Sequence, residues 1–147
     1  MRAQEGAALA AVLAAQIDQI GTLTEDAARA AQARAPQVRA NLTNALQRVM
    51  EDVAEVDEAR LAQELAVLAV KSDVTEEIDR LKAHVGAARD LLATSQPTGR
   101  KLDFLSQEFN REANTLCAKA QSAPLTAIGL DLKAVIDQMR EQIQNVE

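Results

Sequence analysis

Residues 72–93 read SDVTEEIDRLKAHVGAARDLLA, and this stretch decides the fold class. Asp73 is followed three residues later by Glu76, which is the spacing of a capping box at a helix start. After that start, apolar residues recur every three or four positions, the period of one helix face. They are Val74, Ile78, Leu81, Val85, Ala88 and Leu92. The stretch therefore predicts an amphipathic helix that packs one side against a protein core.

The composition extends this prediction to the whole chain of 147 residues. Apolar residues make up 48%, but alanine alone supplies 30 residues, and the only aromatic side chains are Phe104 and Phe109. Ala, Leu, Gln, Glu and Arg favour helices, whereas strands favour β-branched and aromatic residues. This excludes a β-sandwich or barrel, and regularly spaced Leu, Ile and Val argue against intrinsic disorder. We expect an all-α protein, a bundle of about five to six helices.

Two long helices are expected in the N-terminal third. The first runs from about Glu5 to Ala35, where Pro36 ends or bends it because proline lacks a backbone N–H. The second begins at about Gln37. We expect them to form a long helical hairpin, an arm of residues 1–56, beside a helical core of residues 57–147. The core is expected to contain helices at about 57–71, 73–93 and 100–121, with a last one from residue 125.

The net charge of −6 argues against a protein that holds nucleic acid by bulk electrostatics. The average conceals that acidic and basic residues are separated along the chain, because residues 27–50 contain no acidic side chain. The same stretch contains four arginines, Arg29, Arg34, Arg39 and Arg48. Two interpretations stay open: a solvated helix surface, or an arginine-lined arm that contacts phosphates.

Other residue counts limit the location and the chemistry. No apolar run approaches the roughly 18 residues of a membrane-spanning helix, and the N-terminus lacks the ordered regions of a signal peptide. We therefore expect a cytoplasmic protein with no membrane partner. One cysteine, Cys117, excludes an internal disulfide, and one histidine, His84, excludes zinc sites built on two or three histidines. A metal site made of carboxylates remains open.

Two predicted helices carry conspicuous polar faces. Glu77, Arg80 and His84 form one stripe at the edge of the apolar face of the helix from residue 73. On the helix at 100–121, one side carries Phe104, Gln107, Glu108, Arg111, Asn114 and Thr115, flanked by Asp103, Asn110 and Glu112. Such a face either coordinates a ligand, meets a partner or is merely exposed. Phe104 could stack on a base or insert between subunits. Glycine-rich phosphate loops, HExxH and CxxC are absent from the sequence.

Three segments resemble the C-terminal half of the YicC/YloC family of bacterial endoribonucleases. They are RLAQELAVLAVKSDVTEEIDRLKAHV (60–85), GRKLDFLSQEFNREANTLCAK (99–119) and QMREQIQNVE (138–147). The resemblance runs from about residue 5 to the end of the chain. Three positions depart from the family pattern: Val70, Ala83 and Ala118. Family members also carry an N-terminal domain of comparable size, so the resemblance implies that this domain is a missing partner.

The resemblance implies a divalent-metal-dependent endoribonuclease that hydrolyses phosphodiester bonds in single-stranded RNA. Carboxylates of Glu64, Glu77, Glu108 and Glu112 are expected to hold Mg²⁺ or Mn²⁺. His84, Glu77 and Glu108 are expected to take part in catalysis, with His84 as general acid or base. The residues expected to bind RNA are Arg80, Arg100, Lys101, Phe104, Gln107, Asn110, Arg111, Asn114 and Lys119. The alternative is a non-catalytic oligomerisation module of a larger RNA-processing protein; a homo-oligomer is expected.

Overall fold

The computed structural model describes residues 2–52, 57–94 and 97–145, and every regular element in these ranges is an α-helix. The elements are α1 (Arg2–Asp52), α2 (Glu58–Ser72), α3 (Thr75–Ala93), α4 (Gly99–Lys119) and α5 (Ala123–Gln144). The predicted all-α class is therefore confirmed. Five helices stand where five to six were expected, because the first two predicted helices are one.

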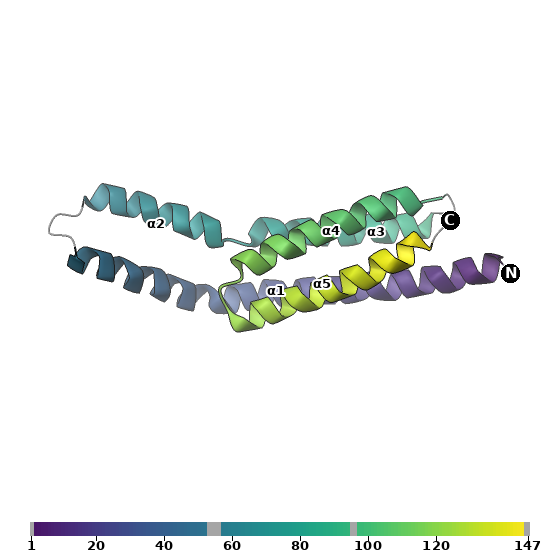
Figure 1. Ribbon diagram of the computed structural model, residues 1–147, viewed down its shortest axis with the longest axis horizontal. Coiled ribbons are helices and arrows are strands. Elements are labelled where there is room, and N and C mark those ends of the chain that lie inside the picture. The colour runs from purple at the N-terminus through teal and green to yellow at the C-terminus, as the bar shows by residue number, and fades with distance from the viewer. Residues whose placement is uncertain (1, 53–56, 95–96, 146–147) are drawn as a thin grey trace.

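The first half of α1 forms a bundle with α3, α4 and α5, while its second half extends beyond them beside α2 as an arm (Figure 1). The bundle core is built from apolar side chains of all four helices that turn away from solvent. Its largest fully buried members are Ile17, Ile20, Leu81, Phe109, Leu116, Leu125, Leu132, Ile136 and Met139. The apolar face predicted for α3 lies in this core, which fixes the orientation of its polar edge.

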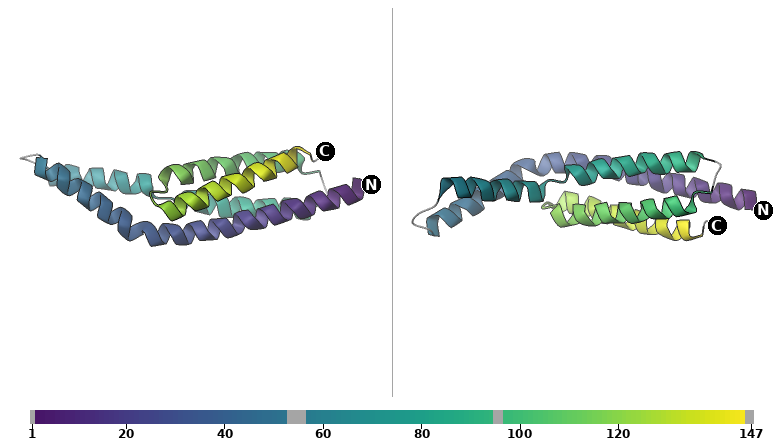
Figure 2. Two further views of the ribbon diagram at one scale, coloured as in Figure 1. Left: turned by 60° about the horizontal axis from the view of Figure 1, so that its bottom comes forward. Right: turned by 90° about the horizontal axis from the view of Figure 1, so that it is seen from above.

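The helix α1 does not end at Pro36, which corrects the predicted hairpin within residues 1–56. The buried side chains of Arg34 and Val38 flank the proline, and their packing outweighs the missing backbone hydrogen bond. Figure 2 shows α1 bending where it leaves the bundle, as helices usually do at a proline. The predicted division between residues 56 and 57 lies beside residues 53–56, outside the described part of the chain.

The alanine-rich composition gives α1 an unexpected property. Within Gly6–Glu51, one window of 18 residues reaches a mean hydropathy of 1.3, so by length and composition alone this helix passes as a membrane-spanning segment. The prediction that no stretch approaches this limit was wrong in that respect. The same helix contributes Leu13, Ile17 and Ile20 to the bundle core, and packing against α3 and α5 accounts for their apolar character.

The start of α3 differs from the prediction, because its N-cap residue is Val74 and not Asp73, and the Val74 side chain makes no capping hydrogen bond. The Asp73 carboxylate accepts hydrogen bonds from the Thr75 N–H at 2.9 Å and from the Thr75 hydroxyl at 2.6 Å. Glu76 does not close a capping box and instead binds Arg80 one turn later. Asp73, one residue before the N-cap, thus provides an acceptor for one of the free N–H groups at the start of α3.

Candidate functional site

The polar edge of α3 faces the polar side of α4 along the seam between the two helices. Three pairs show that the helices run antiparallel: Glu77 meets Lys119, Arg80 meets Glu112, and the His84 ring meets the Phe109 ring. Residues near the start of α3 thus face the end of α4. The family-like segments 60–85 and 99–119 therefore meet at this seam, which we call the α3–α4 seam.

Three side chains of the α3–α4 seam form a group with metal-binding chemistry. His84, Glu108 and Glu112 each offer one ligand atom, and these atoms all lie within 4.8 Å of one another. Glu112 is buried, whereas His84 and Glu108 are half-buried, so the group lies at the edge of the core and is reachable from solvent. Glu108 and Glu112 are one turn apart on α4, which places their carboxylates on the same side.

Packing holds the imidazole of His84 in place. The ring lies edge-on to Phe109, with 5.8 Å between ring centroids and an interplanar angle of 82°. Its Nε2 atom is buried without a hydrogen-bond partner in the described part of the chain. A buried ring nitrogen without a partner is costly, so this atom is available for a ligand.

Arg80 bridges the acidic side chains at the middle of the seam. Its Nη2 donates to Glu76 Oε2 at 2.6 Å, and its Nη1 lies 3.5 Å from Glu112 Oε1. The hydrogen bond to Glu76, followed by the charge of Glu112, raises the pKa of Arg80 above its usual value. The arginine therefore stays charged and offsets part of the negative charge of Glu112.

Glu77 and Glu64, two of the four predicted metal ligands, are not in this group. Glu77 is buried, and its Oε1 accepts a hydrogen bond from Lys119 Nζ at 2.8 Å. Glu64 is exposed on α2, in the arm (Figure 1). The structure brings together Glu108, Glu112 and His84, of which His84 was expected as a general acid or base and not as a ligand.

Beyond the metal-binding group, the exposed side of α4 continues toward its start. Phe104, one turn before Glu108, has 62% of its surface exposed. Together with Arg100 and Lys101 of α4 and residues of α3, it lines a shallow cavity of about 460 Å³. An exposed aromatic ring beside two cations can stack on a nucleobase while the cations contact its phosphates.

The remaining residues predicted to bind RNA differ in their surroundings. Arg111 and Asn114 are exposed on α4, and Asn110 is half-buried. Gln107 is also exposed and donates to Asp103 Oδ2 at 3.2 Å. Arg80 and Lys119 are already in ion pairs within the seam. Thus Arg100, Lys101, Phe104, Arg111 and Asn114 are exposed, and their side chains make no ion pair or hydrogen bond within the described part of the chain.

Sequence reasoning missed the contribution of Glu76 to the site. It precedes Arg80 by four residues, and a glutamate at that distance before an arginine commonly pairs with it on a helix. This spacing was visible in the sequence, but Glu76 was interpreted only as part of a helix cap. The contact of Phe109 with His84 joins two helices and had no local signal.

Comparison with known proteins tests the family resemblance that the motifs suggest. A family model described as "Endoribonuclease YicC-like, C-terminal" matches residues 27–147. The chain belongs to this family. It is similar over all its 147 residues to two proteins named "Probable endoribonuclease YicC": it is 41% identical to that of Haemophilus influenzae and 37% identical to that of Clostridioides difficile. The resemblance inferred from the motifs is therefore confirmed.

This YicC-like chain spans 50% of the length of each of these relatives. The match covers α2–α5 and the second half of α1, and so includes the complete α3–α4 seam. The names of the relatives describe proteins twice as long as this chain.

Proposed function

We propose that this YicC-like chain is part of an endoribonuclease and that it hydrolyses phosphodiester bonds in single-stranded RNA with the help of a divalent metal. The observation that carries the proposal is the group of His84, Glu108 and Glu112 in the α3–α4 seam. The membership of the chain in the YicC-like family supports RNA as the substrate. The N-terminal part of the whole protein is the expected partner of this site.

The residues of the group fit a divalent metal. Two carboxylates suit Mg²⁺ or Mn²⁺, and the imidazole nitrogen favours Mn²⁺, since Mg²⁺ takes oxygen ligands. The unpartnered Nε2 of His84 and the burial of Glu112 are further arguments, because a bound cation would compensate both. Arg80, which lies 3.5 Å from Glu112 Oε1, would share Glu112 with the metal.

The chemistry divides between the metal and the chain's own side chains. When bound, a divalent metal would activate a water molecule and offset the charge that develops on the phosphate. Phe104 would stack on a base next to the cleaved bond, while Arg100 and Lys101 contact backbone phosphates. Arg111, one turn beyond Glu108 on the exposed side of α4, would hold the strand on the other side of the metal-binding group.

A calorimetric titration of the chain with Mn²⁺ tests the proposed metal site. His84→Ala and Glu112→Gln are each expected to weaken Mn²⁺ binding at least about tenfold. Asp137→Asn, at an exposed carboxylate of α5, is the control and should leave the affinity unchanged. Circular dichroism shows whether each variant is folded. Equal Mn²⁺ affinity in folded His84→Ala and Glu112→Gln would reject the site.

A fourth variant distinguishes this group from the four carboxylates predicted from the sequence. Glu64→Gln removes the predicted ligand that lies on α2. If it lowers Mn²⁺ affinity as much as Glu112→Gln does, Glu64 belongs to the site and the arm must close onto the bundle. Cleavage of single-stranded RNA by the whole protein, with and without EDTA, then tests the activity itself. Cleavage that is insensitive to EDTA would contradict metal dependence.

A second candidate function is assembly, and one observation favours it. The arm exposes large apolar side chains on both of its helices: Val49 and Met50 of α1, and Val67, Leu68 and Val70 of α2. Such side chains are suited to contact another copy of the chain. Light scattering measures the size in solution, and Val70→Asp should lower it if the arm forms the contact. A monomeric wild-type chain would reject this function.

A further inference from the structure

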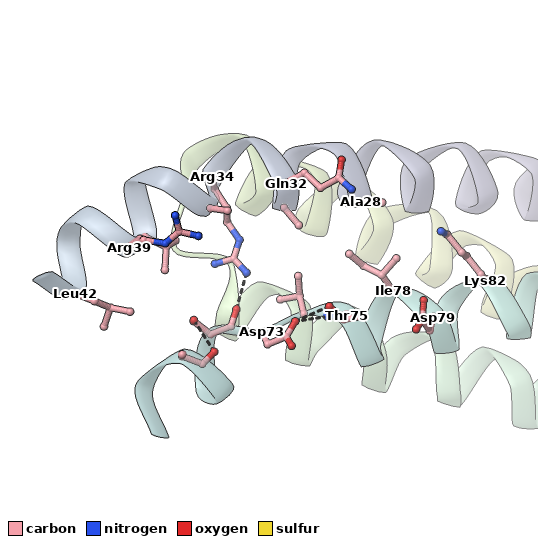
Figure 3. A pocket seen from close by; sticks show the side chains of 16 residues that line it. Ala28, Gln32, Arg34, Arg39, Leu42, Asp73, Thr75, Ile78, Asp79 and Lys82 are labelled. Carbon is pink, nitrogen blue, oxygen red and sulfur yellow. Dashed lines mark hydrogen bonds between the residues drawn. The ribbon is translucent and has the colours of Figure 1, made fainter. Parts of the chain in front are cut away.

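A cavity of about 550 Å³ lies at the elbow, where α1 leaves the bundle (Figure 3). One wall is the middle of α1, with Arg34 and Arg39, and the opposite wall is the junction of α2 with α3. His84, Glu108 and Glu112 are not among the residues that line it. This elbow cavity is therefore separate from the proposed metal site.

Arg34 differs from the other three arginines of the acid-free stretch. Arg29, Arg39 and Arg48 are exposed, whereas only 8% of Arg34 is exposed. Its side chain crosses from α1 toward the α2–α3 junction, and Nη2 donates to the Ser72 carbonyl at 2.5 Å (Figure 3). The Nε and Nη1 atoms are buried and have no hydrogen-bond partner in the described ranges of the chain.

These nitrogen atoms leave three N–H groups of a guanidinium without acceptors. Burial lowers the pKa of Arg34, and the charge of Asp73 acts against that effect. An arginine retains its charge even then, so a buried positive charge stands beside the cavity. Unpartnered buried donors on a charged group are expensive, and an anion would remove that cost.

The surroundings of the elbow cavity favour an anion. Arg39 and Lys82 also line it, and with Arg34 they outnumber the two acidic residues there, Asp73 and Asp79. The carboxylate of Asp73 already accepts two hydrogen bonds from Thr75. The first turn of α3 also borders the cavity, and the N-terminal end of a 19-residue helix attracts negative charge.

We propose that the elbow cavity binds a phosphate group and that Arg34 is its principal ligand. Phosphate oxygens would accept the hydrogen bonds that Nε and Nη1 lack, with Arg39 and Lys82 balancing the remaining charge. The phosphate comes either from an RNA backbone or from a free phosphate ion. An RNA phosphate as the ligand rests on the proposed function and makes the elbow a second contact for the RNA strand. A free phosphate ion as the ligand is independent of the proposed function.

Inorganic phosphate is the first probe. It is titrated into the 147-residue chain at constant ionic strength with chloride as reference anion, and binding is followed by ³¹P line broadening. The wild-type chain should bind phosphate, and Arg34→Met should weaken binding at least about tenfold. Arg48→Met removes an exposed arginine from the same helix, outside the cavity, and should bind as the wild type does.

Arg34→Met also removes the contact with Ser72 and could prevent folding, so two exposed lining residues provide independent tests. Arg39→Met and Lys82→Met should each weaken phosphate binding while keeping the helical circular dichroism of the wild type. Phosphate and RNA affinities that are unchanged in every folded cavity variant would overturn the proposal. Absence of phosphate binding in the wild type, together with RNA affinity unaffected by these variants, would also overturn it.

A short single-stranded RNA and an uncharged-backbone analogue of the same sequence distinguish the two sources. Weaker RNA binding by the cavity variants, with the analogue unaffected, assigns the site to RNA phosphates. Loss of inorganic phosphate binding alone assigns it to the free ion. Mn²⁺ affinity and RNA cleavage are measured on the same variants. If the chain does not bind Mn²⁺, the measured phosphate affinities still test the elbow cavity. If it does not bind phosphate, the measured Mn²⁺ affinities still test the metal site.

Discussion

Lys119, at the end of α4, lies with its Nζ 2.8 Å from Oε1 of Glu77, in the first turn of α3, although 42 residues separate them in the chain. The Glu77 side chain is 4% exposed, and the Lys119 side chain is 28% exposed. Lys119→Met would leave a buried carboxylate without its cation. We expect a loss of about 3 kcal/mol in the free energy of unfolding, measured with urea.

The double variant Glu77→Gln/Lys119→Met is the control for this prediction. It removes both charges, so it should be more stable than Lys119→Met alone. Lys119→Arg keeps the positive charge and should lose less stability than Lys119→Met. The single variant Glu77→Gln is measured as well. If the stability loss of the double variant equals the sum of the losses in Glu77→Gln and Lys119→Met, the two residues do not act as a pair.

The Asp73 carboxylate at the start of α3 predicts a dependence of stability on pH. Hydrogen bonds from the Thr75 hydroxyl and N–H, together with the charges of Lys119 and Arg34, lower the pKa of Asp73. Its contribution is therefore complete above the ordinary carboxyl pKa of about 3.9 and is lost as the pH falls through the lower pKa of the folded state. The stability difference between wild type and Asp73→Asn should shrink over that interval in urea unfolding at pH 2.5–6.

Substitution of Asp73 by alanine and by asparagine separates the cap from the charge. At pH 7, Asp73→Ala should cost about 1 kcal/mol because the Thr75 N–H loses its acceptor. Asp73→Asn keeps an acceptor oxygen and should cost less. Equal losses in the two variants would show that the charge of Asp73, and not its hydrogen bonds, stabilises the start of α3.

Helices α4 and α5 approach each other closely at Gly129. A Cβ atom added there would lie 2.5 Å from Cys117 Sγ. Gly129→Ala should therefore destabilise the bundle by about 1–3 kcal/mol, despite the better helix propensity of alanine. Cys117→Ala in the same chain removes the sulfur and should restore most of the loss in thermal unfolding. A Gly129→Ala variant that is more stable than the wild type would contradict this packing.

The proline inside α1 predicts a gain in stability. Pro36 cannot donate a backbone hydrogen bond to the carbonyl of Gln32, and its ring crowds the preceding turn. Pro36→Ala should raise the free energy of unfolding by up to about 3 kcal/mol and should reduce the bend of α1. Urea unfolding measures the first effect and small-angle X-ray scattering the second. An unchanged scattering profile would mean that packing, and not proline, produces the bend.

The fold was predictable where local patterns and packing agree. The apolar spacing of α3 and α4 placed Leu81 and Phe109 in the core, and both are fully buried. The break at Pro36 was wrong because the local cost of a proline competes with burial of Arg34 and Val38 on either side. The burial of Arg34 depends on Ser72 at the junction of α2 with α3, 38 residues further along the chain, and no local signal describes it.

The candidate site was predictable as a region more than as a set of contacts. The sequence motifs named His84, Glu108 and Glu112, and these three side chains do meet. Glu77 was assigned to the same site because it shares a stripe with His84, but Lys119 reaches it from α4. Arg34 had the same sequence context as Arg39, and only the tertiary structure shows that one is buried and the other exposed.

The unbroken course of α1 has a mechanical consequence. At a rise of 1.5 Å per residue, its 51 residues form a continuous helix with a contour length of about 75 Å, which belongs to the bundle at one end and to the arm at the other. The two parts of α1 are joined without a linker, so a movement of the arm is transmitted directly to the part of α1 that packs against α3 and α5. The bend of α1 lies at the elbow cavity, so a phosphate bound there would contact the arm and the bundle at the point where they join.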